Sequence, residues 1–230
     1  SASPESGRTL LGFTPLFGLE PALHEGDRAS GPFTAIWYVV FALPMLLFTP
    51  DVVRKNVSGA VSKGLSRLWA TLKGLPKERS YFSFLIGSMF YRDALNALYA
   101  FGGIYAAGVL GWSIVQIGTF GILANLTGAV GAWLGGRADQ RFGPKPVITG
   151  SILVLTACCI LVISTTQTEV LFMTVAEAGT QSSLPDIVFY VAGALIGAAG
   201  GSIQAASRTL LVDQVEGDKV TEAFGLYALS

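Results

Sequence analysis

The sequence predicts an all-α protein whose helices cross a lipid bilayer several times, and three observations support this class. Hydrophobic residues make up 51% of the chain and charged residues only 13%, about half the charged share of a typical soluble domain. Each of four stretches also reaches the roughly 20 residues that a helix needs to cross a ~30 Å hydrocarbon core. These four stretches contain no Asp, Glu, Lys or Arg: 29–50, 111–136, 146–168 and 187–207.

The uneven placement of charge argues against a soluble protein of the same length. A fifth long stretch, 81–110, carries only Arg92 and Asp93, so these five stretches hold 122 residues with two charges. The other 108 residues hold the remaining 28 charges. A soluble fold would have to bury several helices about twice the usual length of 11 to 12 residues. We therefore expect a polytopic membrane helix bundle.

The first part of the chain is predicted to consist of a loop, a helix and a linker. We expect an extracytoplasmic loop over 1–31, a spanning helix over 32–50 and a polar linker over 51–80. The linker has apolar residues at steps of three or four, which predicts an amphipathic helix too polar to span: Val57, Val61, Leu65, Leu68, Leu72 and Leu75. It lies either along the membrane surface, with Trp69 near the headgroups, or against the protein's own cytoplasmic face.

The rest of the chain, 81–230, is predicted to form one bundle. Its expected spans are 81–110, 113–135, 146–165 and 186–208, with a further helix starting near Ala223. Glycines recur every fourth residue in two of these spans, and we expect them to form helix-packing surfaces because small residues let helix backbones approach closely in lipid. They are Gly193, Gly197 and Gly201 in one span and Gly131 and Gly135 in another.

Lys and Arg alternate between the loops and predict the orientation. Segments 51–80, 136–145 and 208–222 together hold 12 of them, whereas 1–28 holds two and 169–186 none. Basic loops remain in the cytoplasm. We therefore place the three basic segments in the cytoplasm and expect a multi-pass protein of the cell (inner) membrane.

Arg92, Asp93 and Asn96 lie near the middle of the long stretch 81–110. An ionised group at this depth costs at least ~2.5–3.5 kcal/mol unless it is paired or faces water. We expect Asp93 and Asn96 to line a polar cavity, with Asp93 contacting substrate or carrying a proton. Arg92 would pair with a carboxylate on another helix. The alternative is a structural ion pair that fixes helix register.

A second polar stretch closes the span 186–208. Glycines precede Gln204 and allow the helix to bend beside water or protein. We expect Gln204, and Ser207 below it, to line the same cavity. Arg208 is expected at the cytoplasmic mouth, where it extends to the headgroups.

A short basic link joins the spans 113–135 and 146–165, and its glycines allow a tight turn. Asp139 is suited to capping a helix or pairing with an arginine. The candidate gating residues of this link are Gly136, Arg137, Asp139, Arg141, Gly143 and Lys145.

This link resembles the signature loop of the major facilitator superfamily, which occurs between helices two and three and again between helices eight and nine. Residues 91–106, 204–208 and 224–230 more narrowly resemble the bacterial UMF1-type branch, which is related to the vacuolar amino-acid effluxers of fungi. The resemblance implies a partial major facilitator fold running from helix six to the start of helix eleven, with 51–80 as the link between the two halves. One residue departs from the superfamily pattern, because Gln140 separates Asp139 from Arg141.

The expected function is secondary active transport of a small polar solute by alternating access. We expect coupling to protons, and an amino-acid-like solute fits the resemblance. The partners would be the solute, protons, the bilayer and the remaining helices of a longer protein, since the chain lacks an initiator Met and stops inside an apolar segment. A non-transporting scaffold or receptor is the first alternative, and a membrane-embedded enzyme is the second, less favoured one.

Other functional classes have little support in the sequence. No phosphate-binding Gly-x-x-x-x-Gly-Lys-Ser/Thr motif is present, and no basic-aromatic patch suggests nucleic acid. The single histidine, His24, has no neighbouring cluster, so we expect neither an enzyme, nor a metal site, nor a cofactor. Cys158 and Cys159 are expected to be packing residues.

Overall fold

The computed structural model describes residues 18, 20, 23, 25–50, 59–175, 183–215 and 217–229. The chain divides into two compact units, 1–60 and 61–230, which are described in turn. His24, most of the predicted outer loop 1–31 and residues 51–58 of the predicted linker lie outside the described residues.

The first unit contains one long helix, α1 (Glu25–Phe48). It begins seven residues before the predicted start at 32, and Glu25 lies in its first turn, where an acidic side chain stabilises the helix dipole. The helix ends before Thr49-Pro50, because a residue that precedes proline disfavours the helical conformation. Its aromatic side chains Phe33, Trp37 and Phe41 lie against one another and are exposed within the unit.

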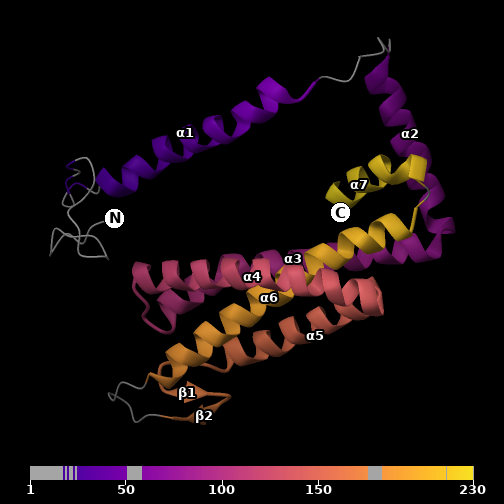
Figure 1. Ribbon diagram of the computed structural model, residues 1–230. Coiled ribbons are helices and arrows are strands. Elements are labelled where there is room, and N and C mark those ends of the chain that lie inside the picture. The colour runs from indigo at the N-terminus through magenta and orange to yellow at the C-terminus, as the bar shows by residue number, and fades with distance from the viewer. Residues whose placement is uncertain are drawn as a thin grey trace. The chain divides into compact units, whose positions relative to one another are not determined.

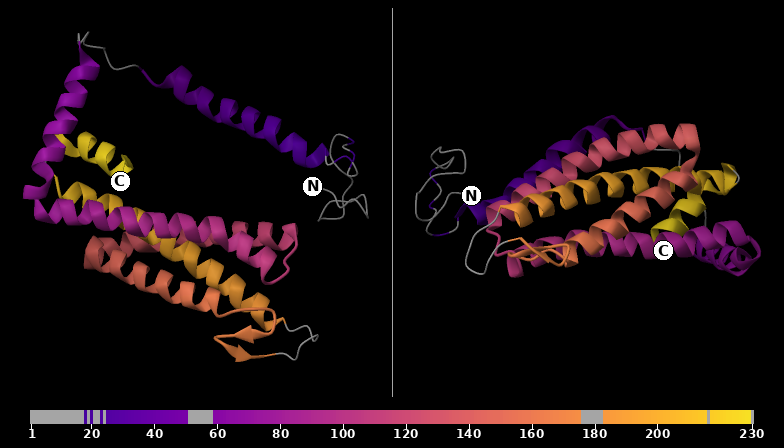
Figure 2. Two further views of the ribbon diagram at one scale, coloured as in Figure 1. Left: turned by 180° about the vertical axis from the view of Figure 1, so that it is seen from behind. Right: turned by 90° about the horizontal axis from the view of Figure 1, so that it is seen from below.

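The second unit contains the remaining elements in the order helix, short turn and long bundle (Figure 1). The elements before the bundle are α2 (Ala60–Gly74) and the 3-10 turn η3 (Leu75–Lys77). The bundle consists of α3 (Arg79–Gly108), α4 (Ile114–Phe142), α5 (Pro144–Ile163) and α6 (Leu184–Asp213). The last elements are η4 (Gly217–Lys219) and α7 (Val220–Leu229). Helix α6 makes its most extensive contacts with α4 and then with α5, and Figure 2 shows it running beside both.

Within the described residues, four helices are long and apolar enough to cross a membrane. They comprise 28–48 of α1 and the whole of α4, α5 and α6. Helix α3 has 30 residues but falls outside this group, chiefly because Arg92, Asp93 and Asn96 lower its hydropathy. The protein is therefore an all-α polytopic membrane helix bundle, as predicted.

A small β-hairpin is the one addition to this class in the described part of the chain. Strands β1 (Glu169–Val170) and β2 (Met173–Thr174) pair antiparallel between α5 and α6. Leu171 and Phe172 at the turn have φ of 53° and 61°, a left-handed conformation that non-glycine residues adopt at a cost. Neither glycine nor asparagine occupies these two positions, so the usual sequence signal for a tight hairpin turn is absent from them.

The bundle helices begin and end where local residues satisfy the free backbone groups. Ser113 caps α4, since its hydroxyl accepts from the Gln116 backbone N–H while Gln116 accepts from the Ser113 N–H at 2.9 Å. Helix α4 ends at Phe142 because Gly143 adopts a φ of 83°, and Pro144 then opens α5. The predicted link over 137–145 is thus helical except for Gly143, which is the glycine of this link that forms the turn.

Three groups of buried side chains hold the unit together. An aliphatic cluster around Leu155, Ile196 and Ile203 joins α3, α5 and α6. An aromatic cluster around Trp112 and Phe189 closes the end where α6 begins. The third cluster joins α2, η3, the start of α3, the end of α6 and α7.

Candidate functional site

The candidate site lies beside a close contact between α4 and α6, which we call the glycine seam. A Cβ on Gly131 would overlap the backbone of Ala198, and a Cβ on Gly201 would overlap the carbonyl of Gly128. Ser202 reinforces the contact, because its hydroxyl donates to the Gly131 carbonyl at 2.7 Å. The predicted packing role is confirmed for all five glycines, which lie at this contact: Gly131, Gly135, Gly193, Gly197 and Gly201.

A pocket of about 530 Å³ opens beside the seam between α3, α4 and α6. Glycines and small apolar residues form much of its wall. Its polar side chains come from all three helices: Tyr99 from α3, Asn125 from α4 and Gln204 from α6. A volume in this range accommodates a small molecule, and a few converging polar groups are the usual means of orienting one.

The three polar side chains reach the pocket for different local reasons. Asn125 donates to the Gly121 carbonyl one turn earlier at 2.8 Å, which leaves its amide oxygen available as an acceptor. Tyr99 approaches α6 because position 200 is a glycine, where a Cβ would overlap the phenol oxygen. Gln204 follows Gly201 by three residues, so both lie on the same face of α6. The site is therefore uncharged and rich in hydrogen-bonding groups.

Gln204 was predicted for this cavity, whereas Asn125 and Tyr99 were not. Asn125 is the amide in the middle of the charge-free stretch 111–136. A search for every polar side chain at that depth, instead of ionised ones alone, would have found it. Tyr99 lies on the turn after Asn96, within the same segment that carries Arg92 and Asp93.

The structure separates Arg92 and Asp93. Arg92 is partly buried, donates to the backbone carbonyl of Tyr227 in α7 and has its guanidinium 4.4 Å from the centre of the Tyr227 ring. Within the described residues its partner is thus a carbonyl and a ring instead of the expected carboxylate. Asp93 is exposed and lies on the side of α3 opposite the buried Leu95, and Asn96 is exposed beside it. Neither Asp93 nor Asn96 lines the pocket.

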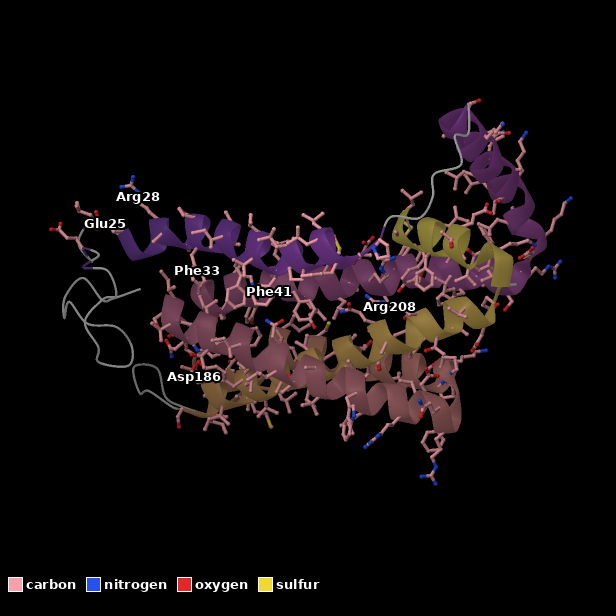
Figure 3. All side chains as sticks on the ribbon, turned by 45° about the horizontal axis from the view of Figure 1, so that its top comes forward. Glu25, Arg28, Phe33, Phe41, Asp186 and Arg208 are labelled. Carbon is pink, nitrogen blue, oxygen red and sulfur yellow. The ribbon has the colours of Figure 1, made fainter. Side chains whose placement is uncertain are left out.

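The polar residues at the end of α6 do not all lie where they were predicted. Ser207 is fully buried and lies 2.7 Å from the hydroxyl of Tyr91 in α3, so it joins two helices and does not line the pocket. Arg208 is exposed near the end of α6, and Figure 3 shows it far along the helix from Asp186. Twenty-two residues separate the two, or about 33 Å of helix, which matches the hydrocarbon core.

The opposite end of the bundle is closed by a hydrogen bond that the sequence did not predict. The Trp112 indole N–H donates to the Asp186 carboxylate at 2.6 Å and fixes the turn between α3 and α4 to the start of α6. Trp112 also packs against Phe189 at 5.1 Å between ring centres. The pocket therefore lies between this closed aromatic end and the end marked by Arg208.

The candidate gating residues occupy the last two turns of α4 and the start of α5. Arg137 stacks on the ring of Trp133 at 3.9 Å, and Arg141 lies 5.3 Å from the ring of Phe142. Asp139 is buried with 7% of its surface exposed, and Gly136 has open space where a side chain would lie. Lys145 borders a second pocket of about 500 Å³ between α3 and α5, whose walls are almost wholly apolar.

Comparison with known proteins identifies the family of the chain. A family model described as "Vacuole effluxer Atg22 like" matches residues 28–229, which is most of the chain. The chain belongs to the Atg22-like vacuole effluxer family. This confirms the resemblance to effluxers of the major facilitator superfamily.

One curated relative of this Atg22-like chain is an uncharacterized MFS-type transporter, YxiO, from Bacillus subtilis (strain 168). The two are 23% identical over 196 residues, which is 84% of this chain and 41% of the relative. The chain thus spans about two fifths of the length of the relative that it matches. No solved structure matches the chain.

Proposed function

We propose that the protein containing this chain is a secondary active transporter of a small polar solute. The observation that carries the proposal is the uncharged polar pocket between α3 and the two helices α4 and α6, which are long and apolar enough to cross the membrane. Polar side chains within lipid are costly unless they serve a site or a water-filled path. Membership in the Atg22-like family supports the same function.

The pocket favours a substrate with several hydrogen-bonding groups and a small volume. Asn125 and Gln204 offer both donors and acceptors, and Tyr99 adds a hydroxyl. A neutral amino acid or a similar solute matches these groups in size and chemistry. The side chains of Arg92 and Asp93 lie apart from this pocket, so charges on such a solute would be met elsewhere in the whole protein.

Alternating access would move this pocket between the two sides of the membrane. In such transporters two halves rock around a central site. The glycine seam supports this motion, because α4 and α6 are joined through their backbones and move as one rigid pair beside the pocket. The cytoplasmic gate would use the end of α4 and the start of α5, with Gly143 and Lys145 at the turn, Gly136 two turns earlier in α4, and the arginines around Asp139.

Asp93 is the proposed proton carrier. It lies 14 residues from the start of α3, or about 21 Å along the helix, and is exposed within its unit. Because an ionised carboxylate is costly in hydrocarbon, this face of α3 would border a water path or another part of the whole protein. Asn96, one turn away, would border the same path.

The proposed orientation follows the basic residues. Arg137, Arg141 and Lys145 all lie where α4 ends and α5 begins, and Arg208 lies toward the end of α6. These ends would face the cytoplasm, and the aromatic end with Trp112 would face outward. We propose the cell (inner) membrane as the location.

Transport by the full-length protein in liposomes tests the proposed solute site. We would measure uptake of labelled neutral amino acids and other small polar solutes by the wild type and by Gln204→Ala and Asn125→Ala. Each variant should weaken apparent affinity by roughly fivefold or more, which corresponds to about 1 kcal/mol for one hydrogen bond. Gln167→Ala is the matched control, because this exposed amide between α5 and β1 lies outside both the pocket and the proposed gate.

Unchanged uptake in both pocket variants would remove the pocket from the transport path. If no solute of the panel is taken up and none raises the Tm of the protein in detergent, the transporter proposal itself is wrong. A scaffold or receptor would then explain the helices.

A separate measurement tests proton coupling. Asp93→Asn should abolish accumulation driven by a pH gradient but preserve exchange of solute across the membrane, since exchange needs no net proton movement. Asp213→Asn, which changes an exposed acid at the end of α6, is the control. Gradient-driven accumulation by Asp93→Asn equal to that of the wild type would contradict the role of Asp93.

A further inference from the structure

Helix α2 presents two different apolar faces, and only one of them packs against the protein. On the packed face, Leu68 lies against the cluster that includes the buried residues Leu75 and Leu226. The Thr71 hydroxyl on the same side donates to Glu222 in the first turn of α7. The sequence left two placements open for this helix, on the membrane surface or against the protein itself. One face of α2 packs on the bundle, and the other face remains available for the membrane.

The second face consists of Leu65, Trp69 and Leu72, which we call the α2 stripe. These residues follow one another at steps of four and three and so form one line along the helix. They are 69%, 62% and 46% exposed. A line of three large apolar side chains on a helix that is otherwise polar marks a contact surface.

Charge around the α2 stripe indicates what would cover it. Residues 60–80 contain five basic residues and a single acid, Glu78. Lys73 lies against Trp69, with its ammonium nitrogen 5.4 Å from the ring centre. An apolar line with an aromatic ring and a flanking lysine, on a basic helix, is the composition of helices that lie in the headgroup region of anionic bilayers.

The position of α2 in its unit is also consistent with a lipid bilayer covering the α2 stripe. Figure 1 shows α2 running across the direction of α3 to α6, at the end where α3 begins. Only η3 and Glu78 separate α2 from α3. A helix that runs across the bundle and ends next to the start of α3 has the orientation of a helix lying along a membrane surface.

We propose that the α2 stripe inserts into the cytoplasmic leaflet and that Lys73, which flanks the stripe, binds the phosphates of anionic lipids. The partner is thus a lipid surface of negative charge. The neighbouring face of α2, with Leu68 and Thr71, keeps its contact with α7 and the cluster around it, so this helix ties the start of α7 to the leaflet. The proposal does not depend on transport activity.

A depth measurement on the full-length protein tests this placement. All native cysteines, Cys158 and Cys159 among them, are first replaced by alanine, and a single cysteine is introduced as Leu65→Cys or Ser66→Cys and spin-labelled. Ser66 is the matched control, because it is exposed and lies about 100° around the helix from Leu65. Accessibility to oxygen and to a water-soluble nickel complex is measured in phosphatidylcholine liposomes with and without one-third phosphatidylglycerol.

The label at 65 should be accessible to oxygen and shielded from nickel in the anionic liposomes, and the label at 66 should show the reverse. Lys73→Gln should lower the ratio of inserted to free helix roughly fivefold in those liposomes. Lys63→Gln is the matched control, because Lys63 lies about 160° around the helix from Leu65, and it should have a smaller effect. Equal nickel access at 65 and 66 would overturn the proposal. A label at 65 that is immobile and shielded from both reagents would also overturn it, because a protein surface would then cover the stripe.

Discussion

Helix α6 contacts its two main neighbours by different means. Toward α4 it presents glycines, so that backbone lies against backbone and Ser202 bonds directly to the Gly131 carbonyl. Toward α5 it presents Ile196, Ala199 and Ile203, which pack against Leu155 and its neighbours. The polar pocket borders the first contact and not the second.

The difference follows from packing in lipid. Burying aliphatic side chains gains little there, since lipid tails are as apolar as leucine, whereas close backbone approach gains dispersion contacts and hydrogen bonds. The glycine seam has one geometry, because any added atom overlaps backbone. The α5 contact is made of side chains that can adjust. A site that needs fixed distances is thus expected beside the seam.

Enlarging a seam glycine should have the greatest effect on stability of the substitutions proposed for these two contacts. Gly201→Leu places a side chain where the Gly128 carbonyl lies, so α4 and α6 must separate. Backbone cannot give way as a flexible side chain does, and we expect loss of well over ~3 kcal/mol of stability. The measurement is the Tm of the full-length protein in detergent, together with the amount recovered as a single species.

Gly118→Ala on α4 is the matched control for this substitution. Gly118 also lies inside the helix, but a Cβ there would meet no atom within 4 Å. Alanine is favoured over glycine in a helix by roughly 0.5–1 kcal/mol, so the Tm should stay the same or rise. If Gly201→Leu is as stable as Gly118→Ala, the seam is not a rigid contact.

Truncating a side chain in the aliphatic contact between α5 and α6 should lower stability less than enlarging a seam glycine does. Leu155→Ala removes a buried side chain that packs between α5 and α6. In water such a change costs about 2–5 kcal/mol, but in lipid the transfer part is largely lost and only the cavity part remains. We therefore expect a loss of about 1–2 kcal/mol, measured by the same Tm assay, with the exposed Leu153→Ala on the same helix as control. A loss as great as that of Gly201→Leu would erase the distinction between the two contacts.

Much of the fold could be predicted because charged residues mark where a membrane helix leaves the hydrocarbon core. The charge-free stretch 187–207 predicted α6, which runs six residues further to Asp213 because a helix continues beyond the bilayer. The turn between α4 and α5 was predicted only within the link between them, because Gly135, Gly136 and Gly143 could each allow a helix break. Gly135 instead packs against Ser202, and the pair Gly143-Pro144 marks the turn.

The site was harder to predict than the helices. Gln204 could be predicted as a cavity residue because it follows a glycine-rich segment. Asn125 could have been predicted only if neutral polar residues had been considered as well as charged ones. The partner of Arg92 could not be predicted, because a backbone carbonyl 135 residues away has no residue-type signature. The bond between Tyr91 and Ser207 likewise joins residues 116 positions apart. Pairings of this kind depend on how the helices pack, which one sequence does not specify.

The smallest predicted effect concerns the hydrogen bond across the seam. Ser202→Ala removes the donor to the Gly131 carbonyl but leaves the backbone contact in place, because alanine is smaller than serine. Hydrogen bonds between membrane helices average about 0.6 kcal/mol, so the Tm should fall only slightly. Thr156→Ala serves as control, since its hydroxyl donates within its own helix to Ile152. A loss in Ser202→Ala above ~2 kcal/mol would mean that polar bonding, and not backbone packing, holds the seam together.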